Sequence, residues 1–136
     1  MKLFKLLAAL LALCLACGVA QARKAELADP DPVAIPAGLG QEQVVKDIKR
    51  TLIGRGWSIT TEQPGQIEST LFLREHVARI RVSWDDGQVR FAYLDSQNLD
   101  YREKKGKRYI HSNYLGWMGY LVQDLNTNFA VSQAGG

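Results

Sequence analysis

The chain has 136 residues, with 17 lysines and arginines against 14 aspartates and glutamates, two histidines, two cysteines and a formal net charge of +3. Its length allows one small domain and excludes a large multidomain enzyme. With so few histidines, and with both cysteines among the first 17 residues, the sequence predicts no zinc site, and we expect no other cofactor.

Residues 1–22 have the pattern of a secretory signal peptide. Two lysines precede an apolar run over residues 6–16, which is too short to span a bilayer as a helix. Cleavage after Ala22 is the favoured processing, and lipidation of Cys17 is the alternative; neither leaves a free thiol. Removal of the leader leaves 15 basic against 14 acidic residues, so the charge does not indicate nucleic-acid binding. We therefore expect a protein of the Gram-negative periplasm, anchored to the outer membrane if it is lipidated.

Residues 23–40 contain three prolines and two glycines. Proline lacks an amide donor and restricts the residue before it to extended geometry, so this segment is predicted to be a stiff, exposed linker. A single domain is expected over residues 41–130, and residues 131–136 are expected to be a flexible tail.

The domain is expected to begin and end with a helix. Apolar residues recur at three- and four-residue spacing over residues 41–53, and glycine follows. The second helix is expected to start at Ser112 or Asn113. Its apolar stripe contains Tyr114, Trp117, Leu121 and Leu125.

Between the helices the apolar period changes to two, which is typical of strands. The strands are expected at residues 57–61, 67–73, 78–84 and 89–93. With Arg74-Glu75 and Asp86-Gly87 as hairpin loops, the alternating apolar residues of the last three strands fall on one face. The predicted fold class is α+β in the order α-β-β-β-β-α, a four-stranded antiparallel meander with two helices packed on one face. All three tryptophans should point into the core.

Two surfaces are candidates for binding a partner. The outer face of the sheet mixes apolar and positive side chains, and its candidate residues are Phe72, Arg79, Arg81 and Arg90. The second candidate is a basic loop of Arg102, Lys104, Lys105, Lys107 and Arg108, which can attract lipid phosphate groups or an acidic protein. The alternative interpretations are an ordinary two-sided sheet and a solvated loop.

A polar cluster around Asp95 and Asp100 suggests a catalytic alternative. Ser96 would be the nucleophile, His111 its base and one aspartate the orienting acid. No glycine-bearing oxyanion loop flanks Ser96, so we favour the interpretation that this cluster fixes the connection between sheet and helix. His76 is the only other histidine and is expected at a hairpin end, far along the sequence from His111. Two histidines are too few for a metal site.

Three motifs support a family resemblance: Arg55-Gly56-Trp57, residues 95–99 and residues 110–117. Over about residues 40–125 the chain resembles a group of small proteobacterial envelope proteins, often lipoproteins, whose function is unknown. The resemblance implies an envelope location and one α+β domain, and it implies no activity or catalytic residues.

The expected function is that of an exported envelope protein that is not an enzyme and that binds another macromolecule. Its partner would be another envelope protein or an anionic envelope surface, with no nucleic acid involved. One alternative is an inhibitor or immunity protein against an enzyme that attacks the envelope. The other is a small hydrolase that uses Ser96 and His111.

Overall fold

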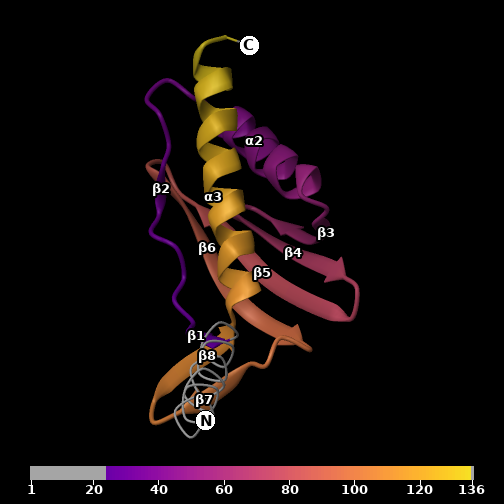
Figure 1. The fold of residues 1–136 in the computed structure, drawn as a ribbon. Coiled ribbons are helices and arrows are strands. Elements are labelled where there is room, and N and C mark those ends of the chain that lie inside the picture. Colours follow the sequence, from indigo (N-terminus) through magenta and orange to yellow (C-terminus); the bar gives the residue numbers. More distant parts are fainter. Residues whose placement is uncertain (1–23, 136) are drawn as a thin grey trace, which may run out of the picture.

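The computed structural model describes residues 24–135, so the expected leader and Cys17 lie outside the described residues. Within them the fold is α+β, with two helices, α2 (Gln41–Gly54) and α3 (Ser112–Gln133), and two antiparallel sheets (Figure 1). The larger sheet has the order β2 (Val33–Ala34), β6 (Gln88–Gln97), β5 (His76–Trp84), β4 (Gln66–Leu73) and β3 (Ser58–Gln63). The smaller has the order β1 (Lys24–Glu26), β8 (Lys107–His111) and β7 (Arg102–Lys104). The prediction of one four-stranded sheet was therefore wrong, although the fold class was right.

The register of the central strands is the predicted one. Trp84 lies opposite Val89, and Glu68 lies opposite Arg81. The two hairpin loops and the apolar alternation agree on this pairing, since a slip of one residue would turn the core side chains to solvent. Leu94 is an extra residue in β6, and this bulge lets the strand continue to Gln97.

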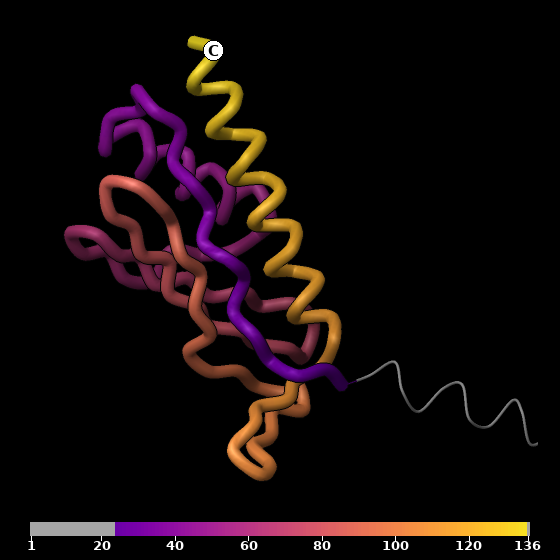
Figure 2. Tube along the Cα trace, turned by 90° about the vertical axis from the view of Figure 1, so that its left-hand side faces the viewer, coloured from indigo at the N-terminus to yellow at the C-terminus, as the bar shows by residue number. Residues whose placement is uncertain are grey.

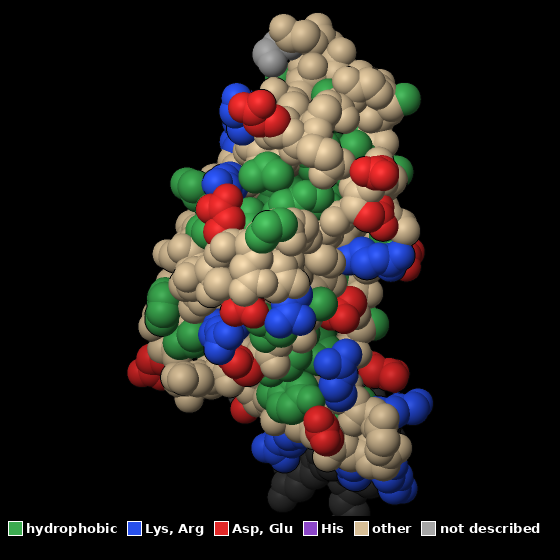
Figure 3. Space-filling view, turned by 180° about the vertical axis from the view of Figure 1, so that it is seen from behind, with side chains coloured by type: hydrophobic (Ala, Val, Ile, Leu, Met, Phe, Trp, Pro, Cys, Tyr) green, Lys and Arg blue, Asp and Glu red, His purple; other side chains and the backbone are tan. Residues whose placement is uncertain are grey.

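Both helices cover the same face of the five-stranded sheet, and α3 crosses in front of it in Figure 1. The core lies between these layers, where Ile48, Leu52, Ile80, Val82, Leu121 and Leu125 are buried. The view from behind shows the opposite face, on which charged side chains of both signs and apolar side chains are mixed (Figure 3). Of the tryptophans, Trp57 is buried, whereas Trp84 and Trp117 are only partly buried. None of the helices in residues 24–135 has the length and apolar character needed to span a bilayer.

Residues 24–39 are not the exposed linker that their prolines suggested. The segment runs across the sheet beside α3 (Figure 2), adding β1 to β8 and β2 to β6. Leu27 and Val33 are buried in the core. The prolines are compatible with this course because β2 is an edge strand, where only one side of the backbone needs donors.

The two ends of α3 also differ from the expectation. The helix continues to Gln133, and Ser132 Oγ donates to the buried Asp47 Oδ1 of α2 at 3.0 Å, so the expected tail is in part a helix packed on the domain. At the other end the N-cap is His111 rather than Ser112 or Asn113. Its Nδ1 accepts the Asn113 amide at 3.1 Å, which satisfies one of the free donors of the first turn.

Candidate functional site

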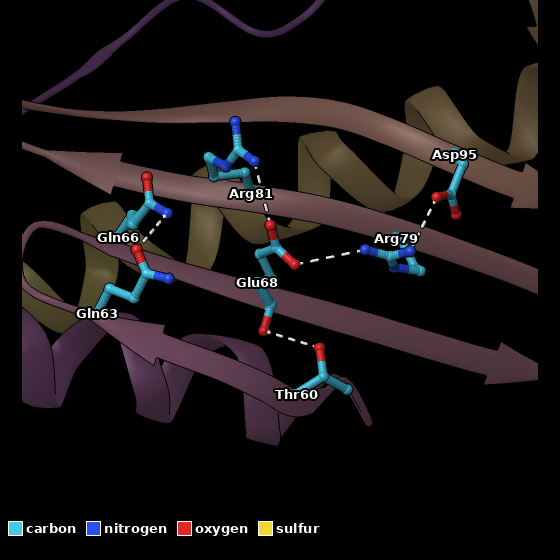
Figure 4. A network of polar contacts seen from close by, with 7 residues as sticks. All are labelled: Thr60, Gln63, Gln66, Glu68, Arg79, Arg81 and Asp95. Carbon is cyan, nitrogen blue, oxygen red and sulfur yellow. Dashed lines mark hydrogen bonds and ion pairs between the residues drawn. The ribbon is translucent and has the colours of Figure 1, made fainter.

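The arginines of the outer sheet face already have carboxylate partners. Arg79 donates to Asp95 at 2.9 Å and to Glu68 at 3.4 Å, and Arg81 donates to the other oxygen of Glu68 at 3.1 Å (Figure 4). Glu68 thus lies between the two guanidinium groups, as the predicted register allowed. These contacts neutralise the positive charge within the fold, which leaves less of it for a partner.

The other two candidates on this face lie at opposite ends of it. Phe72 pairs with Val77 near the start of β5, and Arg90 pairs with Ser83 near its end. Six residues of an extended strand separate Val77 from Ser83, roughly 20 Å. The outer face therefore does not gather its four candidate residues into one site, although Phe72 itself is 66% exposed.

A pocket on the inner side of β4 was not anticipated from the sequence. It has a volume of about 190 Å³ and is lined by Arg55, Trp57, Leu71, Leu73, Trp117 and Tyr120; we call it the aromatic pocket. Trp57 and Leu71 are buried, whereas Leu73 and Tyr120 are 43% and 50% exposed. The pocket therefore has a fixed apolar interior and a rim that is open to solvent.

The chain reversal at the end of α2 explains how Arg55 and Trp57 reach this pocket. The amides of Gly56 and Trp57 donate to the carbonyls of Ile53 and Leu52, each at 3.0 Å. Gly56 has a φ of +84°, which glycine adopts without the steric cost of a Cβ. The turn leaves Arg55 exposed and buries Trp57 two residues later.

Arg55 is held at the rim of the pocket by α3. Its Nε and Nη2 donate to the two carboxylate oxygens of Asp124 at 2.6 and 3.1 Å, and its Cζ lies 4.6 Å from the centroid of the Tyr120 ring. The hydrogen bonds from Arg55 lower the pKa of Asp124 below its usual range. Among the described residues Nη1 of Arg55 has no hydrogen-bond partner, so it can donate to a bound molecule.

The residues of the catalytic alternative are bonded to other groups and not to one another. The Ser96 hydroxyl lies 2.7 Å from the Tyr93 hydroxyl, and Asp95 accepts from Arg79. Nδ1 of His111 is occupied by the helix cap. Burial raises the pKa of Tyr93, so its hydroxyl stays protonated at neutral pH and is a poor base.

The two histidines are far apart in the sequence but near each other in the structure. The rings of His76 and His111 have centroids 6.3 Å apart, and the ring of Trp117 is equally far from that of His76. His76 Nδ1 donates to the Asn98 carbonyl at 2.6 Å. Within residues 24–135 no three side chains of the metal-binding types form a group, so the pair has no third ligand there.

The basic stretch is a hairpin rather than a loop. Lys105 and Gly106 form the turn between β7 and β8 with φ values of +53° and +76°. This two-residue turn is compatible with the right-handed twist of a hairpin. The ion pairs found in residues 24–135 include no lysine or arginine of the hairpin, in contrast to the outer face.

Comparisons with protein-family models, curated proteins and solved structures found no match to this chain. The resemblance to small envelope proteins therefore stays a prediction.

Proposed function

We propose that this chain is an exported envelope protein that is not an enzyme and that binds a partner protein through the aromatic pocket. The observation that carries the proposal is a concave apolar surface, walled by Trp57, Trp117 and Tyr120, that the fold itself leaves unfilled. Tryptophan, tyrosine and arginine are the residues that most often dominate the binding energy of protein interfaces.

The size of the pocket suits one apolar side chain. A dry cavity of about 150 Å³ is known to hold one benzene molecule, and the volume here is about 190 Å³. Burying a leucine or phenylalanine side chain contributes about 1.5–3 kcal/mol. One such anchor residue, with further contacts around it, is enough for a specific interaction.

Arg55 gives the pocket a polar feature beside its apolar interior. Asp124 and the Tyr120 ring fix the guanidinium, so little side-chain entropy is lost when Nη1 donates to a partner. The preferred ligand is therefore a peptide segment that has an apolar anchor with a carbonyl or carboxylate oxygen next to it. The inhibitor or immunity hypothesis is a special case in which the partner is an enzyme.

The hydrolase hypothesis has less support, because Ser96 is bonded to Tyr93 and Nδ1 of His111 caps a helix. An active-site probe for serine hydrolases gives a direct check. Labelling that depends on Ser96 would contradict the proposal that the protein is not an enzyme.

Selection from a displayed peptide library tests the pocket. Enriched peptides should share an apolar anchor residue, and Leu73→Asp should weaken their binding by more than about tenfold, because it places a charge at the apolar rim. Phe72→Asp is the matched control, since Phe72 is the neighbouring exposed residue and lies on the outer face. An equal loss of peptide binding in both variants, or a loss of binding only with Phe72→Asp, would overturn the proposal.

A further inference from the structure

The register of the three-stranded sheet gathers positive side chains on one of its faces. Arg102 lies opposite Tyr109, Lys104 opposite Lys107, and Lys24 opposite His111. Residues that pair directly, and residues two apart on one strand, point to the same side of a sheet. Lys24, Arg102, Lys104 and Lys107 therefore share a face around Tyr109, and we call it the basic face.

The other side of the same small sheet is turned toward the domain. Ile110 lies between Tyr109 and His111 on β8 and is fully buried, and its partner on β1 is Ala25. Because side chains alternate along a strand, the burial of Ile110 fixes the basic face toward solvent. Lys24, Arg102, Lys104 and Tyr109 also line one open hollow of about 400 Å³ together with Glu103, so these residues are close together.

The basic face has four cations and two carboxylates near them. Glu26 shares the face because it pairs with Tyr109. Glu103 pairs with Arg108 and borders the hollow, and it accepts a hydrogen bond from the Tyr101 hydroxyl. The cations that surround Tyr109 form no ion pair within residues 24–135. Lys105 at the turn adds one more exposed positive charge.

The chain also enters the domain at this place. Figure 1 shows β1, the first described strand, beside β8 and the hairpin at one end of the molecule. Residues 1–23 join the domain at Lys24, and Cys17 precedes it by seven residues. Seven residues of extended chain reach roughly 23 Å, so an acyl group on Cys17 would keep Lys24 within that distance of the bilayer surface.

We propose that the basic face docks on the anionic phospholipid headgroups of a membrane, with the hairpin end of the domain toward the bilayer. Unpaired lysines and arginines are attracted by the negative surface potential, and tyrosine is favoured at the level of the headgroups. This inference goes beyond the proposed function, since it concerns a different surface and a different partner. Docking at the basic face leaves the aromatic pocket, whose residues come from other elements, free for its own ligand.

Binding to vesicles tests the proposal, with protein purified from cells that express the full chain. One set of vesicles is phosphatidylcholine alone, and in the other about a third of the lipid is phosphatidylglycerol. We expect tighter binding to the anionic set and loss of this preference at about 0.5 M salt. The ratio of the two binding constants is the readout, because an acyl anchor would strengthen both equally.

Replacing Lys104, Lys105 and Lys107 by glutamine should lower this ratio on the order of 100-fold, at about fivefold for each lysine that reaches the surface. The matched control replaces Lys46, Arg50 and Arg90, three positive residues outside the hairpin, by glutamine. It should leave the ratio within about twofold of that of the unchanged protein. Both variants lose the same net charge. A ratio near one for the unchanged protein, or an equal fall of the ratio in the two variants, would overturn the proposal.

Discussion

The two sides of β4 meet solvent in different ways. Phe72 and Leu73 are neighbours on the strand and both are exposed, but Phe72 lies on the open outer face and Leu73 lines a pocket. The outer face carries ion pairs in which Glu68 serves two arginines. The inner side carries apolar walls that no part of the described chain fills.

This difference shows which exposed residues are free to bind. If exposure alone identified binding residues, Phe72 would be preferred to Leu73. If clustered positive charge alone identified them, Arg79 and Arg81 would be preferred to Arg55. The contacts change both rankings, because Leu73 shares a concave surface with Trp117 and because Arg55 lies at the rim of the same pocket. Arg55 is paired with Asp124 as the outer arginines are with Glu68 and Asp95, so Arg55 is distinguished by the pocket beside it and not by an unpaired charge. A binding site is therefore better indicated by an apolar pocket that the fold leaves unfilled than by the exposure of single side chains.

The largest expected effect concerns packing on the two sides. Trp57→Ala removes a buried ring from the floor of the pocket and should lower the free energy of unfolding by about 3–5 kcal/mol. Phe72→Ala should change it by less than about 0.5 kcal/mol, because most of that ring is already in water. Urea denaturation measures both. A loss of several kcal/mol for Phe72→Ala would show that the outer face is packed, and the comparison would fail.

An intermediate effect is expected for the charges of the outer face. Glu68 is only 20% exposed, and Glu68→Lys would place a third cation between Arg79 and Arg81. We expect a loss of about 2 kcal/mol in the free energy of unfolding, less than for a fully buried pair because the arginines are half-exposed. Glu75→Lys in the exposed turn between β4 and β5 is the control, with a change within about 0.5 kcal/mol. A similar loss of unfolding free energy in both variants would mean that the outer ion pairs contribute no more to stability than an exposed carboxylate does.

The smallest effect concerns the ion pair at the pocket rim. Because the pKa of Asp124 is lowered in the folded state, its carboxylate stabilises the fold above the unfolded pKa of about 4, and this stabilisation is lost as the pH falls through the folded pKa. The free energy of unfolding of the unchanged protein should therefore exceed that of Asp124→Asn at neutral pH, and the difference should shrink in acid. The pKa of Asp85 is lowered by the amides of Gly87 and Gln88. Asp85 is present in both proteins, so its contribution to the pH dependence cancels in the difference. A difference that is constant with pH would contradict the assignment.

The central strands could be predicted from the sequence because two independent constraints agree there. The apolar alternation sets the face of each strand, and the short loops set the pairing. The Asp85 carboxylate accepts the amides of Gly87 and Gln88 at 2.8 and 2.9 Å, which stabilises the turn that the Asp86-Gly87 pair had indicated.

Strands β1 and β2 were not predicted, because the strands with which they pair are distant in the chain. Leu27 donates its amide to the Arg108 carbonyl, about eighty residues later, and β1 and β2 are too short to show a period. For the hairpin a signal was present. Lys105-Gly106 between two short charged segments is compatible with a two-residue turn, but the charge density favoured a solvated loop.

The aromatic pocket could not be predicted because it depends on how α3 crosses the sheet. Trp57, Leu71 and Trp117 come from three separate parts of the chain, and all have the period of core residues. Only the tertiary structure shows that Trp57 is buried and Trp117 is half-covered, with Arg55 and Tyr120 completing the rim.

The most direct test of the proposed binding site is an NMR titration of the protein with a peptide selected from the library. The indole N–H signals of Trp57 and Trp117 should shift on binding, since both rings line the pocket, while that of Trp84 at the far end of β5 should stay in place. The backbone amides of Arg79 and Arg81 should also be unaffected. Shifts at these two arginines with no change at the indoles of Trp57 and Trp117 would place the site on the outer face and contradict the account.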